Sequence, residues 1–181
     1  MSTLNGKRIA LLISDGFAGR EASLASEALL MAGAEIDIVS IRSGPIAAEG
    51  GSDSIVARAL GGAYSRPYAG LLIPGGAQSA EHLRKERAAM VFVDSFVGSG
   101  KPIAVIGHGV VILADLGYLD GSTVSAPAAL RDRLVAAGAC WVDQSVSVDH
   151  GFISGRSADE LTDFNNAMVE AFALAEVGVA V

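Results

Sequence analysis

The apolar run over residues 103–106 ends abruptly at Gly107-His108-Gly109. This sharp break, together with the histidine, makes the segment the best candidate for chemistry in this chain. Residues 103–106 are typical of a buried strand, and residues 110–116 of the start of a helix. A strand that turns abruptly into a helix is where many α/β enzymes hold a nucleophile. Glycine at position 107 has no side chain that could attack a substrate. The segment is therefore either an active site without its reactive atom or a turn that never had one.

Two further side chains are candidates for proton transfer near this turn. Glu21 falls in the first turn of the helix predicted after the first strand, so its carboxylate could face Gly107. The alternative is an acidic residue placed for the positive end of a helix dipole. His108 is either a general base or orienting group, or a helix N-terminal histidine with a satisfied hydrogen bond.

Backbone amides supply a third candidate, because Gly75 and Gly76 open a helix after the third predicted strand. Their N–H groups could form an oxyanion hole or a small anion site. The alternative is a tight turn that needs positive φ.

The other histidines and the cysteine are not expected to form a site. His82 and His150 are predicted to be exposed, and neither has Cys, Asp or Glu at the spacing of metal ligands, so we expect no metal and no cofactor. Cys140 leads into a strand and is predicted to be a buried structural residue.

Composition limits the classes of function. The chain has 181 residues, of which 51% are hydrophobic, and a net charge of −7. This length suits one domain, which we place over residues 1–181. The acidic charge without a basic cluster argues against nucleic acid and against anionic membranes as partners. A single cysteine allows no internal disulfide, and no apolar stretch is long enough to span a bilayer. We therefore expect a cytoplasmic protein.

Apolar periodicity predicts alternating strands and helices. Strands are predicted at 7–13, 35–41, 69–76, 101–106, 122–124 and 140–148, with a hairpin turn at 149–151 and a return strand at 152–155. Between 44 and 68 the chain is Gly-rich, with one or two short strands at most. Helices are predicted at 78–97, 110–117 and 127–137, and from 157 onward. This pattern predicts an α/β sandwich with a mostly parallel sheet and helices on both faces.

Two helices carry more detailed predictions. In the helix after the first strand, Leu24, Ala28 and Met31 fall on one face, which is predicted to be buried. The last helix should start at Ser157 as N-cap, with Glu160 completing a capping box. Its buried stripe is predicted to be Leu161, Phe164, Met168 and Phe172.

Four segments in the same order resemble the ThiJ/PfpI superfamily, with the bacterial PfpI-like branch as the closest match. "IALLISDGF" resembles the family's first strand and loop, and "AGLLIPGG" resembles D-A-L-L-L-P-G-G. "FVGSGKPIAVIGHG" resembles F-x-x-x-G-K-P-V-A-x-I-C-H-G-P, and the segment ending in "SGRSADELTDF" resembles the family's S-R-x-P-x-D-L region. The resemblance covers nearly the whole chain. It implies a flavodoxin-like three-layer sandwich and a homodimer or hexamer with a stress-related role.

Carried over by position, the resemblance assigns the family's nucleophilic cysteine to Gly107 and its neighbouring histidine to His108. It assigns the activating carboxylate to Glu21 and the oxyanion donors to the Gly75 and Gly76 amides. In this family the nucleophile sits in a strained backbone turn between strand and helix, which costs on the order of 1–3 kcal/mol for a residue with a Cβ. Glycine avoids most of this cost.

The departures from the family pattern are not confined to the nucleophile. Val110 replaces the usual proline, and residues 15–21 lack three acidic positions of D-E-F-E-D-x-E. This joint drift favours a natural loss of the nucleophile over a single engineered Cys→Gly change.

Three hypotheses follow from these residues. The preferred one is a binding or stress-related homo-oligomer without cysteine-dependent activity. The second is a cysteine-independent hydrolase, deglycase/glyoxalase-like enzyme or lyase that uses Glu21, His108 and water. Ser14 and Ser79 also lie near strand ends, but no base is evidently paired with either. The third is a regulatory module that binds a small metabolite through Gly75, Gly76 and Glu21.

Overall fold

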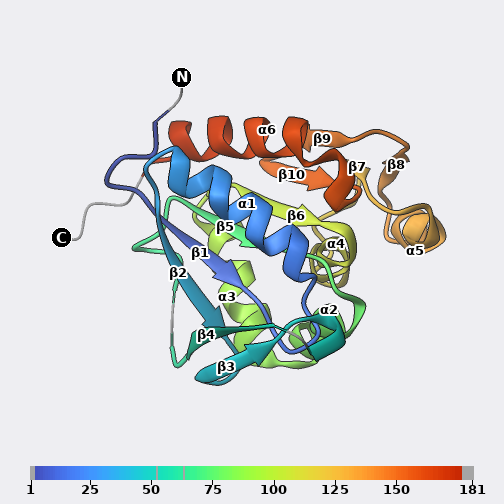
Figure 1. Ribbon diagram of the computed structural model, residues 1–181. Coiled ribbons are helices and arrows are strands. Elements are labelled where there is room, and N and C mark those ends of the chain that lie inside the picture. Colours follow the sequence, from blue (N-terminus) through green and yellow to red (C-terminus); the bar gives the residue numbers. More distant parts are fainter. Residues whose placement is uncertain (1–2, 52, 63, 177–181) are drawn as a thin grey trace.

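The computed structural model describes residues 3–51, 53–62 and 64–176. Its strands are β1 (Arg8–Leu12), β2 (Glu35–Ser40), β3 (Gly44–Ala47), β4 (Ser54–Ala59), β5 (Gly70–Ile73), β6 (Ile103–Ile106), β7 (Thr123–Ser125), β8 (Cys140–Val142), β9 (Val146–Asp149) and β10 (Phe152–Gly155). Its α-helices are α1 (Gly19–Met31), α2 (Ala77–Lys85), α3 (Arg87–Gly98), α4 (Val110–Asp115), α5 (Arg131–Ala136) and α6 (Leu161–Leu174). Figure 1 shows their arrangement.

An eight-stranded sheet forms the middle layer, in the order β3-β4-β2-β1-β5-β6-β10-β9. Its central neighbours are parallel, and antiparallel pairs close both edges, β3 with β4 and β9 with β10. β7 and β8 form a separate parallel pair. The predicted α/β class, the mostly parallel sheet and the hairpin are confirmed.

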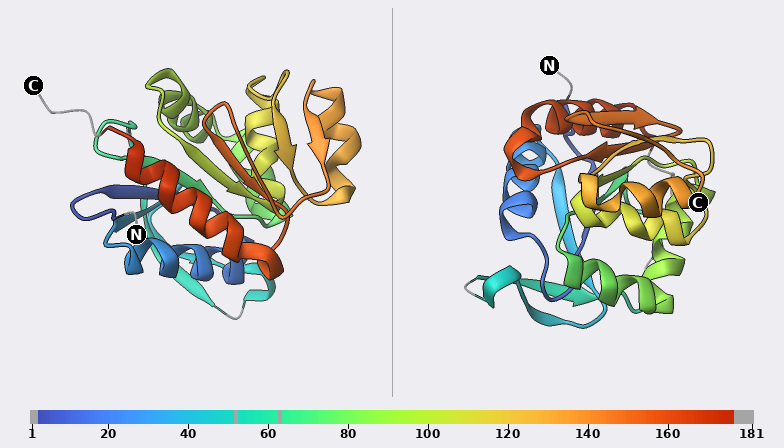
Figure 2. Two further views of the ribbon diagram at one scale, coloured as in Figure 1. Left: turned by 90° about the horizontal axis from the view of Figure 1, so that it is seen from above. Right: turned by 90° about the vertical axis from the view of Figure 1, so that its right-hand side faces the viewer.

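Helices cover both faces of this sheet (Figure 2). The apolar faces of α1 and α6 pack on one side, over Ile9, Leu11 and Ile13 of the first strand region. On the other side, α2, α3 and α4 contribute to the core that contains Ala10 and Leu12, and α5 packs against β8. Because side chains alternate along a strand, each central strand contributes to both cores, which explains why these strands are continuously apolar.

The buried stripe of α6 matches the prediction, since Leu161, Phe164, Met168 and Phe172 are all buried. The predicted start of this helix is wrong. Ser157 makes no side-chain capping bond, and a 3₁₀ turn (Ala158–Glu160) precedes α6. The Glu160 carboxylate instead pairs with the Arg156 guanidinium, which is a stronger partner than a backbone N–H.

The predicted buried face of α1 is also wrong. Ala22, Ala25 and Leu29 face the core, whereas Met31 is 83% exposed. The predicted and the observed sets of three residues both have helical spacing. In a segment rich in Ala and Leu, periodicity alone therefore does not show which set is buried. The contact of α1 with both α6 and the sheet selects the face that carries Leu29.

The single helix predicted over residues 78–97 is two helices. Glu86 adopts an extended conformation with ψ of 110° and separates α2 from α3. The break lets each helix follow the twisted sheet with its own apolar side, through Leu83 in α2 and Phe92 in α3. The strand predicted at 140–148 is divided in the same way, because β8 pairs with β7 and β9 pairs with β10.

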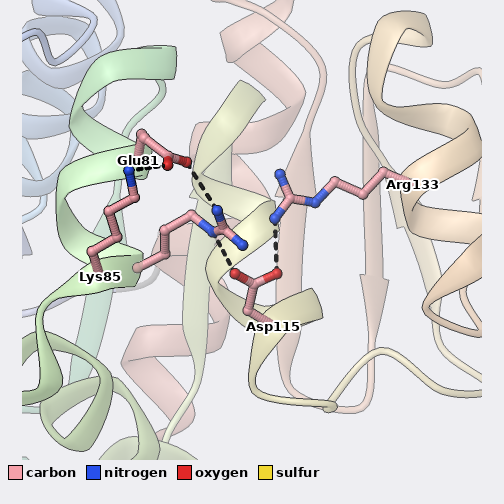
Figure 3. Close-up of polar contacts among 5 residues, drawn as sticks. Glu81, Lys85, Asp115 and Arg133 are labelled. Atoms are coloured by element: carbon pink, nitrogen blue, oxygen red, sulfur yellow. Dashed lines mark hydrogen bonds and ion pairs between the residues drawn. The ribbon is translucent and has the colours of Figure 1, made fainter.

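An ionic network joins α2, α4 and α5 (Figure 3). Asp115, at the end of α4, pairs with Arg84 of α2 and with Arg133 of α5, the latter at 2.8 Å. Glu81 contacts Arg84 at 3.0 Å and Lys85 at 2.6 Å. The network thus fixes α2 relative to α4, and both helices begin at the candidate site.

The face of α1 can be tested with two adjacent leucines. Leu29 is fully buried and Leu30 is 57% exposed, so the two share side-chain chemistry and helix propensity but differ in burial. We expect Leu29→Ala to lower the free energy of unfolding by about 2–5 kcal/mol and Leu30→Ala by less than about 0.5 kcal/mol. Urea denaturation followed by circular dichroism measures both. Similar losses for the two variants would contradict this orientation of α1.

Candidate functional site

Glu21 connects α1 to the turn after β5. It lies in the first turn of α1, and its Oε2 accepts a hydrogen bond of 2.7 Å from the Gly75 backbone N–H. The backbone adds a second link, since the Ala18 N–H donates to the Gly75 carbonyl at 2.9 Å. The carboxylate is therefore fixed at the edge of the sheet where the strands end.

Gly107 brings the end of β6 to the same carboxylate. Its φ is +53°, a left-handed conformation that favours glycine. A Cβ built on Gly107 would lie 3.5 Å and 3.7 Å from the two carboxylate oxygens of Glu21, and 3.7 Å from the Gly75 Cα. These are ordinary van der Waals distances. A side chain would therefore fit here without a clash, and it would start next to the carboxylate.

The Gly75-Gly76 turn is shaped by close contacts with the loop after β1. Gly76 has φ of +101°, and a Cβ there would lie 2.2 Å from the Gly16 carbonyl oxygen. A Cβ on Gly75 would lie 2.4 Å from Glu21 Oε2. Both positions thus need glycine to let the loop approach, and the Gly75 N–H already has the Glu21 carboxylate as acceptor.

Burial sets the protonation chemistry of Glu21. Loss of solvent raises the pKa of its carboxyl above the ordinary value of 4.5, and the nearby Glu49 carboxylate adds to this. The hydrogen bond from the Gly75 N–H partly opposes the shift. The group is therefore easier to protonate than an exposed glutamate, which favours a role in proton transfer.

His108 directly follows Gly107 in a 3₁₀ turn (Gly107–Gly109) that leads into α4, and it is half-buried. Its ring forms no hydrogen bond with Glu21 or with any other residue that the structure describes. The structure thus brings Glu21, Gly75 and Gly107 together and places His108 beside them without a direct link. Within the described residues, no group of three or more His, Cys, Asp or Glu is placed to hold a metal ion.

Two predictions about the remaining candidates are wrong. Cys140 is exposed rather than buried, because it begins β8 in the two-stranded sheet, where helices do not cover it on both faces. His82 is half-buried rather than exposed, and its Nδ1 lies 3.4 Å from Ser14 Oγ. Sequence reasoning missed this pair. The available signal was the spacing of Ser79 and His82, which places both on one face of α2 beside the end of β1.

Comparison with known proteins identifies the family. The DJ-1/PfpI family model matches residues 7–171. This chain belongs to the DJ-1/PfpI family. An uncharacterized Staphylococcus haemolyticus protein is 35% identical over 167 residues, which cover 91% of this chain and 96% of that protein. YraA of Bacillus subtilis, whose name provisionally calls it a cysteine protease, is 30% identical over 160 residues, or 88% and 94% of the two chains.

Solved structures of the same family share the fold. Drosophila melanogaster DJ-1beta has a TM-score of 0.85 at 20% identity, over 92% of this chain and 90% of that chain. The ThiJ/PfpI domain protein of Brachyspira murdochii has a TM-score of 0.86 at 20% identity, over 94% and 100% of the two chains. The flavodoxin-like architecture predicted by resemblance is thereby confirmed. No helix among the described residues is long and apolar enough to cross a membrane.

The left-handed backbone at Gly107 predicts an energetic cost for any other residue there. A Cβ at this position would make only ordinary van der Waals contacts, so the cost comes from the positive φ alone. Gly107→Ala should therefore lower the free energy of unfolding by about 1–3 kcal/mol. Gly98 ends α3, with no heavy atom within 4 Å of its Cβ position, so Gly98→Ala should be neutral or stabilising by up to about 1 kcal/mol. Urea denaturation of both variants checks the contrast, and equal effects would argue against the left-handed turn.

The raised pKa of Glu21 predicts a pH-dependent stability. The folded state holds this proton more tightly than the unfolded state, so stability is lost as the pH rises from 4.5 through the raised pKa, and then levels off. Glu21→Gln keeps an oxygen acceptor for Gly75 but cannot ionise. We expect the stability of the wild type relative to this variant to fall across that window, in urea titrations at several pH values. Glu27→Gln, a change at an exposed position of the same helix, is the matched control.

Proposed function

We propose that this DJ-1/PfpI-family protein has no cysteine-dependent activity at the Glu21–Gly107 site and that this site binds a ligand without catalysing a reaction. One observation carries the proposal. The residue above the Glu21 carboxylate is glycine, so no nucleophilic atom projects from the turn that follows β6. The chain's single cysteine, Cys140, lies on the separate β7–β8 pair.

The rest of the site supports binding rather than turnover by the family's thiol route. The Gly75 N–H, one of the two backbone donors that resemblance assigns to an oxyanion, already bonds to Glu21 Oε2. A ligand at this edge would meet the Glu21 carboxyl, whose raised pKa lets it act as hydrogen-bond acceptor or, once protonated, as donor. Self-association and a stress-related role are part of the proposal on family resemblance alone.

A cysteine placed at position 107 tests whether the site lacks only its nucleophile or has a different chemistry altogether. In a Cys140→Ser background, we expect the protein to show no turnover of methylglyoxal or of simple peptides. Gly107→Cys in the same background should gain turnover, because the Cβ that carries its thiol would lie 3.5 Å from a carboxylate oxygen of Glu21. Lactate formation and peptide cleavage are the measurements.

Glu21→Gln provides the control in both backgrounds. It should abolish the activity gained with Gly107→Cys and leave the glycine form unchanged. Turnover by the glycine form that disappears with Glu21→Gln would overturn the proposal. That result would favour the cysteine-independent enzyme that uses Glu21, His108 and water.

A further inference from the structure

Two serine–histidine contacts lie outside the Glu21–Gly107 site. Ser14 Oγ lies 3.4 Å from His82 Nδ1, at the end of β1. Ser122 Oγ lies 3.2 Å from His150 Nδ1, at the turn between β9 and β10. Both serines are buried, at 1% and 2% exposure. A serine becomes a nucleophile only when the facing ring nitrogen can accept its proton.

The proton on Nδ1 separates the two pairs. His150 Nδ1 lies 3.3 Å from Asp149 Oδ1, and the pKa of that carboxyl is lowered, chiefly by the hydrogen bond from the Thr123 N–H. An ionised carboxylate can only accept a hydrogen bond, so its proximity favours the ring form with the proton on Nδ1. In that form, Nδ1 of His150 is a donor and cannot take the proton of Ser122.

His82 has the opposite arrangement. Within the part of the chain that the structure describes, no carboxylate lies within ion-pair distance of its ring. The neighbouring Asp15 carboxylate is instead bound by the Arg42 guanidinium at 2.9 Å and the Ala47 N–H at 2.9 Å. In the tautomer that carries its proton on the other ring nitrogen, Nδ1 of His82 can accept the Ser14 proton.

The position of Ser14 suits a reaction at an acyl group. It follows β1 at the carboxyl edge of the sheet, where ligands of such folds bind. Its backbone N–H donates to Ser79 Oγ at 2.9 Å, which holds it against the first turn of α2. Ser14 therefore lies beside the N-terminal turn of α2, whose dipole would favour a negative oxygen there.

Access to Ser14 limits the size of a substrate. The serine is almost fully buried, and His82 is half-buried. The exposed Gln78 side chain lies over the adjacent loop, since a Cβ on Gly16 would be 2.5 Å from Gln78 Oε1. The burial of Ser14 therefore favours a small acyl group over a long chain.

We propose that Ser14 and His82 form a nucleophile–base pair that hydrolyses esters of small, uncharged acyl groups, independently of the function proposed for the Glu21–Gly107 site. Ser14 Oγ attacks the ester carbonyl carbon as its proton passes to His82 Nδ1. The ester C–O bond breaks, and the departing alkoxide takes that proton. Water then attacks the acyl-serine through the same base, which releases the acid and returns the proton to Ser14.

The test uses 4-nitrophenyl acetate with the full chain in a Cys140→Ser background, which removes the only thiol. We expect a burst of nitrophenol and one acetyl group per chain, found on the Ser14 peptide by mass spectrometry. Ser14→Ala should abolish this label, and His82→Gln should slow its formation by about 100-fold or more. The octanoate ester should react far more slowly than the acetate.

The second serine–histidine pair is the matched control. Ser122→Ala and His150→Gln should leave both the burst and the label on Ser14 unchanged. The proposal is overturned if Ser14 carries no acetyl group in the otherwise native chain, a result that needs no variant to fold. It is equally overturned if Ser14 is acetylated at the same rate in His82→Gln. Neither result alters the expectation for Gly107→Cys, so the two proposals fail separately.

Discussion

The hydrogen bond from the Gly75 N–H to the Glu21 carboxylate organises the carboxyl edge of the sheet. At 2.7 Å it joins the first turn of α1 to the turn that begins α2, two elements separated by 54 positions in the chain. Hydrogen bonds to a charged acceptor contribute about 1.5–3 kcal/mol, and this one partly offsets the cost of burying the carboxylate. Burial still prevails, which is why the pKa of Glu21 is raised rather than lowered.

Glycines make this arrangement geometrically possible. The β1 loop approaches Gly76 so closely that a methyl group there would overlap the Gly16 carbonyl oxygen. Gly107 differs, because a side chain would fit and only its backbone conformation is unfavourable for other residues. The turn at 107 is thus one that a residue with a side chain could occupy at a modest energetic cost, whereas the turn at 76 is not.

Proton positions, rather than proximity, give the two serine–histidine pairs different chemistry. Ser122 is nearer to its histidine than Ser14 is, yet the Asp149 carboxylate favours a proton on the nitrogen that Ser122 faces. The charged groups near His82 are bound elsewhere, Asp15 to Arg42 and Glu81 to Arg84 and Lys85. The ionic network that holds α2 against α4 therefore also leaves the His82 ring nitrogen available.

The sequence by itself determined the alternation of strands and helices and the resemblance to the family, and it offered Glu21 as a carboxylate that could face Gly107. These follow from apolar runs and from motifs that occupy short, continuous segments. Only the tertiary structure decided which face of α1 is buried, where the helix over 78–97 breaks, and that Cys140 is exposed. It also paired Ser14 with His82, a contact across 68 positions. Periodicity specifies which residues share a face, but the neighbour that covers the face is set by packing between distant segments, which local pattern does not encode.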